Sequence, residues 1–188
     1  ARRWCRRPRP SRRPRPAGSA EAYGTTFEPI GFAYNTRLLP AAEVPRTHGE
    51  LVRLLGAPGG RFKGRVTTYD IENSGLGFLF ASQDAKASPM FWDVTRALGG
   101  NGARLQTSTA AMLDSLQAGT SVLAYNLLGS YAHGRSQAHP SVGFVYPRDY
   151  TLVVSRIAFI NRRAQHPQAA RLWLDYLLSR RGQAVMAQ

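Results

Sequence analysis

Residues 108–132, STAAMLDSLQAGTSVLAYNLLGSYA, indicate the fold class most directly. Apolar residues at helical spacing predict a helix over 108–118, and Gly119 marks its end. The apolar run over 121–126 then reads as a strand, and Gly129-Ser130-Tyr131 marks the change from that strand to another helix. The stretch therefore predicts a helix, a strand and a helix in succession.

The same alternation continues on both sides of this stretch. Thr47 and Glu50 have capping-box spacing, and Ser88-Pro89 has the pattern of an N-cap followed by proline at the first helical position. Strands are expected over 30–35, 65–69, 142–146 and 152–160, and helices over 50–55, from near Gly75, from Ser88-Pro89 to Gly99-Gly100, over 168–178 and in a short last segment. Alternating strands and helices imply an α/β fold with largely parallel sheets.

Composition narrows the class of protein. The chain has 188 residues, the size of one ordinary domain, and its 43% hydrophobic residues suffice for a buried core. Apolar runs are too short to cross a bilayer, and no apolar stretch follows the basic N-terminus, so the chain lacks a recognisable signal peptide. The single cysteine, Cys5, cannot form an internal disulfide.

The net charge of +14 is concentrated at the N-terminus. Residues 1–20 hold eight arginines and no acidic residue, and RRPRP occurs there twice. Proline and mutually repelling arginines predict a disordered segment. It could be an arm for nucleic acid or membrane, a solvated tail, or a product of the wrong reading frame; we favour the last, so no nucleic-acid partner is expected. The folded region is then expected over 21–188.

No enzyme motif is found. The chain has no G-x-S-x-G or H-E-x-x-H motif and no cysteine nucleophile in its folded part, so no catalytic residue and no cofactor are expected. His133 and His139 are interpreted as exposed loop histidines, because no third metal ligand lies nearby in the sequence. The glycines over 56–64 resemble a phosphate loop but precede a strand, and we interpret them as a turn.

Two corners where a strand gives way to a helix contain candidate ligand-binding residues. Asn73, Ser74 and Gly75 lie at the first, where free backbone N–H groups and the helix dipole suit an anion. The alternative is that Asn73 or Ser74 only caps the helix.

The second corner follows the strand over 121–126. It contains Tyr125, Asn126, Ser130 and Tyr131. Ligands of open α/β sheets lie beyond the carboxyl ends of strands, so the two corners could form opposing walls of a pocket. The alternative is that the two tyrosines are core aromatics whose hydroxyls are satisfied.

The order of these segments resembles the type 2 periplasmic binding proteins of bacterial ABC importers, in particular the branch that includes iron(III)-binding proteins. The matching stretches are GFAYNTRLLP (31–40), GELVRLL and FKGRV (49–55, 62–66), TTYDIENSG (67–75), LQAGTSVLAYNLLGSYA (116–132), YPRDYTLVVSRIAFI (146–160) and AQHPQAARLWLDYLLSRRGQAVMA (164–187).

The resemblance implies a periplasmic binding protein-like II fold, in which two α/β lobes close over a ligand and present it to a membrane permease. It implies a nearly complete second lobe over about 44–145 and a partial first lobe from 22–40 and 150–188. The chain then looks like an N-terminally truncated piece of a monomeric, periplasmic parent protein.

The resemblance leaves the solute open. Iron(III) binders of this family use two adjacent tyrosines near the segment 127–131, which reads Leu-Leu-Gly-Ser-Tyr here. Without that pair, an organic or phosphorylated anion fits at least as well as ferric iron. Two other functions remain as alternatives: a nucleic-acid-binding protein that uses the basic tail, and the periplasmic sensor domain of a signalling protein.

Overall fold

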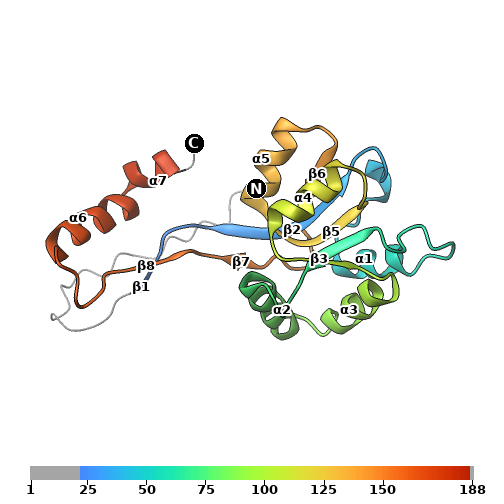
Figure 1. Cartoon of the computed structure of the whole chain (residues 1–188), viewed down its shortest axis with the longest axis horizontal. Helices are drawn as coiled ribbons and strands as arrows, with labels where there is room; N and C mark the ends of the chain where they lie inside the picture. Colours follow the sequence, from blue (N-terminus) through green and yellow to red (C-terminus); the bar gives the residue numbers. More distant parts are fainter. Residues whose placement is uncertain (1–21, 187–188) are drawn as a thin grey trace. The chain divides into compact units, whose positions relative to one another are not determined.

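The computed structural model describes residues 22–186 and is shown in Figure 1. The predicted tail over 1–20 lies outside the described residues. The elements in chain order are β1 (Ala22–Gly24), β2 (Glu28–Asn35), the 3-10 helix η1 (Ala41–Glu43), α1 (His48–Leu55), β3 (Val66–Tyr69), α2 (Gly75–Ala87), α3 (Phe91–Gly100), β4 (Arg104–Gln106), α4 (Thr109–Gln117), β5 (Leu123–Leu128), α5 (Gly129–Ala138), β6 (Val142–Val145), β7 (Val153–Val154), β8 (Ile157–Phe159), α6 (Pro167–Leu178) and α7 (Arg180–Met186).

The described chain divides into two units, of which the larger spans Thr26–Ser155. Its sheet has the strand order β4-β3-β5-β2-β6, and β7 pairs with the start of β2. Strand β3 is parallel to β4 and to β5, whereas β2 is antiparallel to β5 and to β6. Thus β4, β3, β5 and β6 share one direction, and β2 runs against them.

The expectation of largely parallel sheets therefore needs correction, because the sheet is mixed. Strands joined through a crossover helix must run parallel, as β3, β4 and β5 do. Strand β2 precedes this series and inserts between β5 and β6 in the opposite direction. The alternation of strands and helices carries no information on the direction of such a strand.

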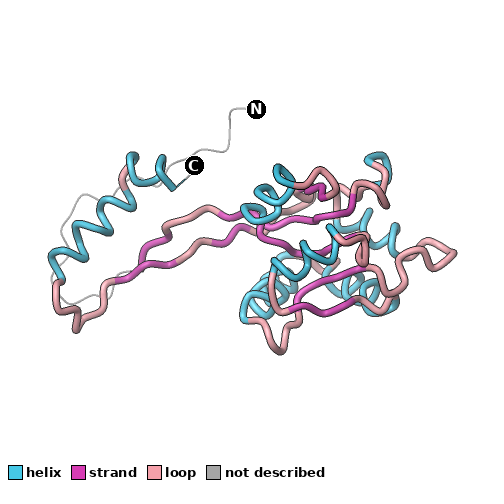
Figure 2. Tube along the Cα trace, turned by 45° about the horizontal axis from the view of Figure 1, so that its top comes forward, coloured by secondary structure: helices cyan, strands magenta, loops and turns pink. Residues whose placement is uncertain are grey.

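The core of this unit consists of two clusters of buried side chains. One contains Phe32, Leu39, Val44, Leu51, Leu55, Phe62, Val66, Val94, Leu98, Val122, Leu123, Tyr125 and Val145. The other contains Ile30, Ala33, Tyr69, Phe80, Met112, Leu113, Leu116, Ala124, Leu127, Leu128, Ala132 and Val142. Phe32 and Ala33 of β2 enter different clusters, as do Leu123 and Ala124 of β5, as expected for a sheet that is covered on both faces. Figure 2 shows helices packed around the strands of this unit.

The predicted helix starts are confirmed in part. Thr47 caps α1 by accepting a hydrogen bond from Glu50 N at 3.0 Å, but the Glu50 carboxylate accepts from Arg46 N rather than from the cap residue. Ser108 caps α4 through Ala111 N at 3.2 Å. Ser88 ends α2, and its hydroxyl accepts from Met90 N, so α3 begins at Phe91, later than the Ser88-Pro89 pattern predicted.

Three further segments differ from expectation. The short strand β4 was not predicted, because its exposed, mostly polar residues lack an apolar run. The strand expected over 152–160 is two short strands, β7 and β8, separated by Ser155 and Arg156. His133 lies within α5 rather than in a loop, and only His139 follows the helix.

The smaller unit comprises, among the described residues, 22–25 and 156–186. Strand β1 pairs antiparallel with β8, and Gln183 of α7 donates hydrogen bonds to the carbonyl oxygens of Thr25 and Leu177. Only Leu174 of α6 and Gly182 of α7 are buried, while Leu172 and Trp173 are largely exposed. No helix in the described part of the chain has the length and apolar character required to span a membrane.

Candidate functional site

The two predicted corners lie at one edge of the sheet. Strands β3 and β5 are neighbours and run parallel, so their carboxyl ends point the same way. Helix α2 begins at Gly75, shortly after β3, and α5 begins at Gly129, directly after β5. The first N–H groups of a helix have no partner within it, so both helices direct hydrogen-bond donors toward this edge. We call it the ligand edge.

At the start of α2, Ser74 is buried and acts as the N-cap, with Oγ accepting a hydrogen bond from Gly77 N at 3.2 Å. Asn73 donates from Nδ2 to Asp70 Oδ2 at 2.8 Å. This bond and a second from the Glu72 backbone lower the pKa of Asp70. Gly75 is exposed, and no atom lies within 4 Å of the position that a Cβ would occupy. Ser74 therefore matches the capping interpretation, while Gly75 leaves the first turn of α2 accessible.

Tyr125 and Asn126 are held by a buried carboxylate that the sequence analysis did not single out. Asp84 of α2 has no exposed surface. Its Oδ2 accepts hydrogen bonds from Tyr125 Oη, at 2.7 Å, and from Asn126 Nδ2, and its Oδ1 accepts from Tyr150 Oη at 3.2 Å. Burial, followed by the negative charge of Asp84, raises the pKa of both tyrosines above the ordinary value. Tyr125 thus has the geometry of a core aromatic with a satisfied hydroxyl.

Asn126 has an unusual backbone conformation. Its φ of 61° lies in the left-handed region, where asparagine is tolerated better than most residues. Opposite it, Gly31 pairs with Leu127 and Ala33 with Ala124, so three residue steps on β5 face two on β2. Strand β5 therefore carries one extra residue, a β-bulge, at Tyr125-Asn126. The predicted end of the strand at Asn126 is in fact this bulge, and the strand continues to Leu128.

At the start of α5, Ser130 and Tyr131 are both exposed. The Ser130 hydroxyl donates to Glu28 Oε2 at 3.1 Å, and Thr26 donates to the other carboxylate oxygen at 2.8 Å. Tyr131 lies close enough to Tyr69 to contribute to the raised pKa of that phenol, for which burial is the larger cause. Since Tyr69 ends β3, Tyr131 of α5 extends toward the neighbouring strand of the ligand edge.

The structure thus divides the predicted residues into two groups. Gly75, Ser130 and Tyr131 are exposed at the ligand edge, and Asn73 is exposed beside them but bonded to Asp70. Ser74, Tyr125 and Asn126 are buried and hold the backbone of that edge in place. The sequence did contain one signal for Asp84: it shares a helix face with Gly77 and Phe80, and a carboxylate in an apolar stripe is rarely buried without a specific partner.

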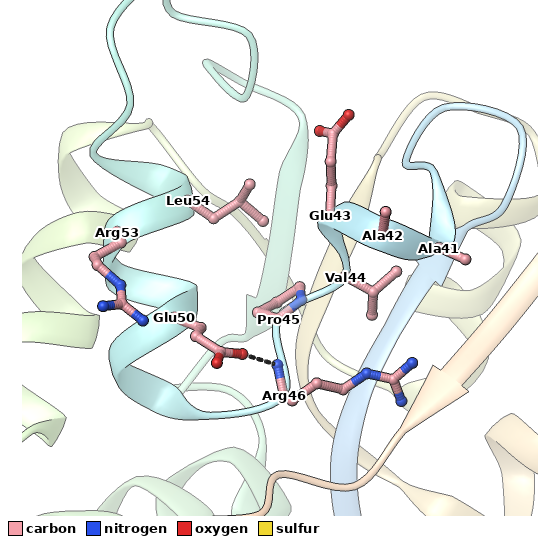
Figure 3. Close-up of a pocket in the computed structure, with 9 residues that line it drawn as sticks. All are labelled: Ala41, Ala42, Glu43, Val44, Pro45, Arg46, Glu50, Arg53 and Leu54. Carbon is pink, nitrogen blue, oxygen red and sulfur yellow. Dashed lines mark hydrogen bonds between the residues drawn. The ribbon is translucent and has the colours of Figure 1, made fainter.

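The described surface has a separate hollow of about 500 Å³ between η1 and α1. Figure 3 shows its lining, which includes Glu50 and Arg53 of α1 and the Arg46 backbone, whose N–H donates to the Glu50 carboxylate. None of the predicted ligand-binding residues lines it. Within residues 22–186, no group of three His, Cys, Asp or Glu side chains is arranged to hold a metal ion.

Comparison with known proteins identifies the family. The family described as "Bacterial extracellular solute-binding protein" matches residues 14–188. The chain belongs to this family of solute-binding proteins. The match covers nearly the whole sequence and begins before residue 22, where the resemblance was expected to start. Comparison with curated proteins finds no match.

Solved structures agree with this assignment. The substrate-binding protein of an ABC transporter from Agrobacterium tumefaciens is 40% identical and superposes with a TM-score of 0.82, covering 89% of this solute-binding protein and 50% of its own chain. Iron-bound HitA from Pseudomonas aeruginosa is 19% identical, with a TM-score of 0.64. The match covers 89% of this chain and 54% of the HitA chain. AfuA from Actinobacillus pleuropneumoniae with fructose-6-phosphate bound is 20% identical, with a TM-score of 0.60. The match covers 86% of this chain and 50% of the AfuA chain.

The fold is therefore that of the type 2 periplasmic binding proteins, represented by partial lobes. The solute-binding chain spans about half the length of these relatives. Its family is a transport family rather than an enzyme family, and an extracellular solute-binding protein of a bacterium works outside the cytoplasmic membrane.

Proposed function

We propose that the whole protein is the substrate-binding component of an ABC importer. It captures a small solute in the cleft between its two lobes, and the closed form delivers that solute to a membrane permease. Family membership and the 40% identity to an ABC-transporter binding protein support this role. A solute that contacts the closed state more extensively than the open one shifts the protein toward closure, which is the signal that a permease would read.

The observation that carries the proposal is the convergence of two helix starts at the ligand edge. Helices α2 and α5 both present N-terminal N–H groups there, and the Ser130 and Tyr131 hydroxyls lie in the second helix start. This set of donors suits an anionic group, such as a carboxylate or a phosphate. The Ser130 hydroxyl donates its proton to Glu28, so the backbone N–H groups of the two helix starts are the main donors to the solute.

The solute is therefore proposed to be an organic or phosphorylated anion, with ferric iron as the second candidate. The structural relatives include one with fructose-6-phosphate bound and one with iron bound, so the fold accommodates both classes. Backbone donors at the ligand edge favour the anion. Asn73, Ser74, Gly75, Tyr125, Asn126, Ser130 and Tyr131 remain the proposed ligand-binding set, with Gly75, Ser130 and Tyr131 in contact with the solute and the others behind them.

A thermal-shift experiment tests this proposal. The 188-residue chain is melted with inorganic phosphate, fructose-6-phosphate, a panel of carboxylates and ferric citrate, each over a range of concentrations. A ligand that binds only the folded state raises the melting temperature in proportion to the logarithm of its excess over Kd. A shift with one anion supports the proposal, a shift with ferric citrate alone selects the second candidate, and no shift contradicts the role of this edge.

A matched pair of variants then locates the site. Ser74→Ala and Ser108→Ala each remove an N-cap with the same 3.2 Å hydrogen bond, at α2 and α4 respectively. Both variants should lose about 1 kcal/mol of stability. Ser74→Ala should also weaken binding of the anion, by several-fold more than Ser108→Ala does, because Ser74 adjoins Gly75, which is proposed to contact the solute. Equal affinities in the two variants would place the ligand elsewhere.

A further inference from the structure

We infer that Asp84 is a positioning residue for the ligand edge: its carboxylate holds the β-bulge at Asn126 and thereby places Ser130 and Tyr131. This inference rests on the proposed function only in calling the edge a ligand site. The buried carboxylate of Asp84 determines the path of the chain from β5 into α5, whether or not a ligand binds there.

The first step is the isolation of Asp84. The side chain is fully buried, and no salt bridge to it is found within residues 22–186. Its charge is balanced by hydrogen bonds from Tyr125, Asn126 and Tyr150. Such charge-assisted bonds are strong in a buried setting, and losing the acceptor leaves buried donors unsatisfied. Each of the three donors is therefore held firmly to this carboxylate.

The second step is the conformation that this bond maintains. Asn126 is the one residue other than glycine with positive φ in the described part of the chain, and it lies inside a strand rather than in a turn. Left-handed backbone is unfavourable for any residue with a Cβ, so it persists only when surrounding contacts require it. The bond from Asn126 Nδ2 to Asp84 is such a contact.

The third step is the consequence for the residues that follow. In an unbroken strand, Leu127 would share a face with Leu123 and Tyr125, since side chains alternate with a period of two. Leu127 instead packs, together with Leu128, in the same cluster as Ala124, while Leu123 and Tyr125 pack in the other. The extra residue at Tyr125-Asn126 thus interrupts the alternation. It rotates the chain just ahead of Gly129, where α5 begins.

Asp84 consequently links the two halves of the ligand edge. It belongs to α2, whose first turn contains Gly75, and it holds the bulge that orients Ser130 and Tyr131. A Cβ on Gly129 would lie 2.7 Å from both Pro29 O and Tyr146 Oη, so the start of α5 has little room for a different path. Placement of that start is therefore sensitive to the bulge.

The test uses Asp84→Asn, Asn126→Gly and the double variant in the 188-residue chain without ligand. In Asp84→Asn, an NH2 group can replace the carboxylate oxygen that accepts from Tyr125 and Asn126, so that donors face donors. We expect the backbone amide resonances of 127–131 to shift and their hydrogen-exchange protection to fall by about tenfold to a hundredfold. Glycine adopts positive φ without help, so adding Asn126→Gly should return both the resonances and the protection toward those of the unmodified chain.

Two controls separate positioning from general destabilisation. Tyr150→Phe removes the third donor to Asp84 but leaves the Asn126 bond, so the resonances of 127–131 should stay in place. Asp93→Asn repeats the same substitution at an exposed ion pair on α3 and should change nothing at the edge. If Asp84→Asn does not fold, Asn126→Ala replaces it, because alanine keeps the Cβ but loses the bond to Asp84.

Unchanged resonances of 127–131 in a folded Asp84→Asn chain would overturn the inference. So would failure of Asn126→Gly to restore them, since Asp84 would then act by another route. Because no ligand is present, a chain that binds no solute would count against the proposed function and leave this result unaffected.

Discussion

The imidazole ring of His48 lies flat against the phenol ring of Tyr150, with ring centroids 4.0 Å apart and planes 5° apart. The same imidazole bonds through Nδ1 to Asp149 at 3.0 Å, and His48 N donates to the Asp149 carboxylate at 2.9 Å. Because Tyr150 also donates to Asp84, this stack connects the start of α1 to the buried carboxylate of α2. One ring stack and one hydrogen bond therefore connect His48 of α1, through Tyr150, to Asp84 of α2.

The first prediction concerns acid stability. Burial opposes ionisation of Asp149, but hydrogen bonds from the backbone and side chain of His48 outweigh it and lower its pKa. A lowered pKa stabilises the fold above the unfolded value of 3.8, and that contribution disappears as pH falls through the folded value. Asp149→Asn should cost about 1 kcal/mol at pH 7, because the carboxylate is partly exposed, and this cost should shrink as pH falls below 3.8.

Urea unfolding of both chains from pH 7 to pH 3 measures this difference. Asp93→Asn, at an exposed ion pair, serves as the control and should shift stability by less than about 0.5 kcal/mol at any pH. A pH-independent gap between the original chain and Asp149→Asn would contradict the linkage.

The second prediction concerns alkaline pH. Burial and Asp84 raise the pKa of Tyr125 and Tyr150, so both phenols stay protonated in the folded state when unfolded tyrosine ionises. The unfolded state then loses protons first, and stability should decline as pH rises above about 10. In Tyr125→Phe/Tyr150→Phe this decline should be shallower, although the variant starts from lower stability.

Phenolate absorbance and circular dichroism, followed together during a base titration, provide the measurement. Part of the absorbance change should coincide with unfolding in the original chain, and this part should be smaller in the double variant, where Tyr69 still has a raised pKa. Complete ionisation ahead of any loss of helix signal would show that these phenols are accessible.

A third prediction compares two glycines of α2. A Cβ on Gly77 would lie 2.6 Å from Tyr69 Cβ and 3.0 Å from Asp70 O, because α2 approaches β3 closely there. Gly77→Ala should destabilise the fold by about 1–3 kcal/mol. Gly75→Ala has open space and should be neutral or stabilising by up to about 1 kcal/mol. Thermal melts of both variants measure these changes in stability. Equal changes in the two variants would mean that α2 does not pack against β3 as described.

A fourth prediction concerns residues 26–155. Both clusters of core residues lie entirely within this unit, whereas the smaller unit buries little apolar surface among its described residues. A fragment of residues 26–155 should therefore fold alone and melt within a few degrees of the full chain. Near- and far-ultraviolet circular dichroism test this, and a fragment without a cooperative transition would show that the smaller unit is required.

Much of the ligand edge could be predicted from the chain because its signals are local. Ser74 caps α2, as one of the two interpretations of that corner held, and the corners after β3 and β5 lie at one edge as alternating strands and helices imply. Asp84 was missed because its role depends on Tyr125, Asn126 and Tyr150, which approach it only when α2 packs against the sheet. Spacing along the chain does not report such contacts.

The amino-acid order alone was enough to establish most of the helices and strands, the cap at Thr47 and the resemblance to solute-binding proteins. These features depend on residues within a turn or two of one another, so neighbouring side chains encode them. The reversed direction of β2, the bulge at Asn126 and the burial of Asp84 emerged only from the folded chain. Each depends on segments far apart in the sequence, and packing rather than local preference selects among their possible arrangements.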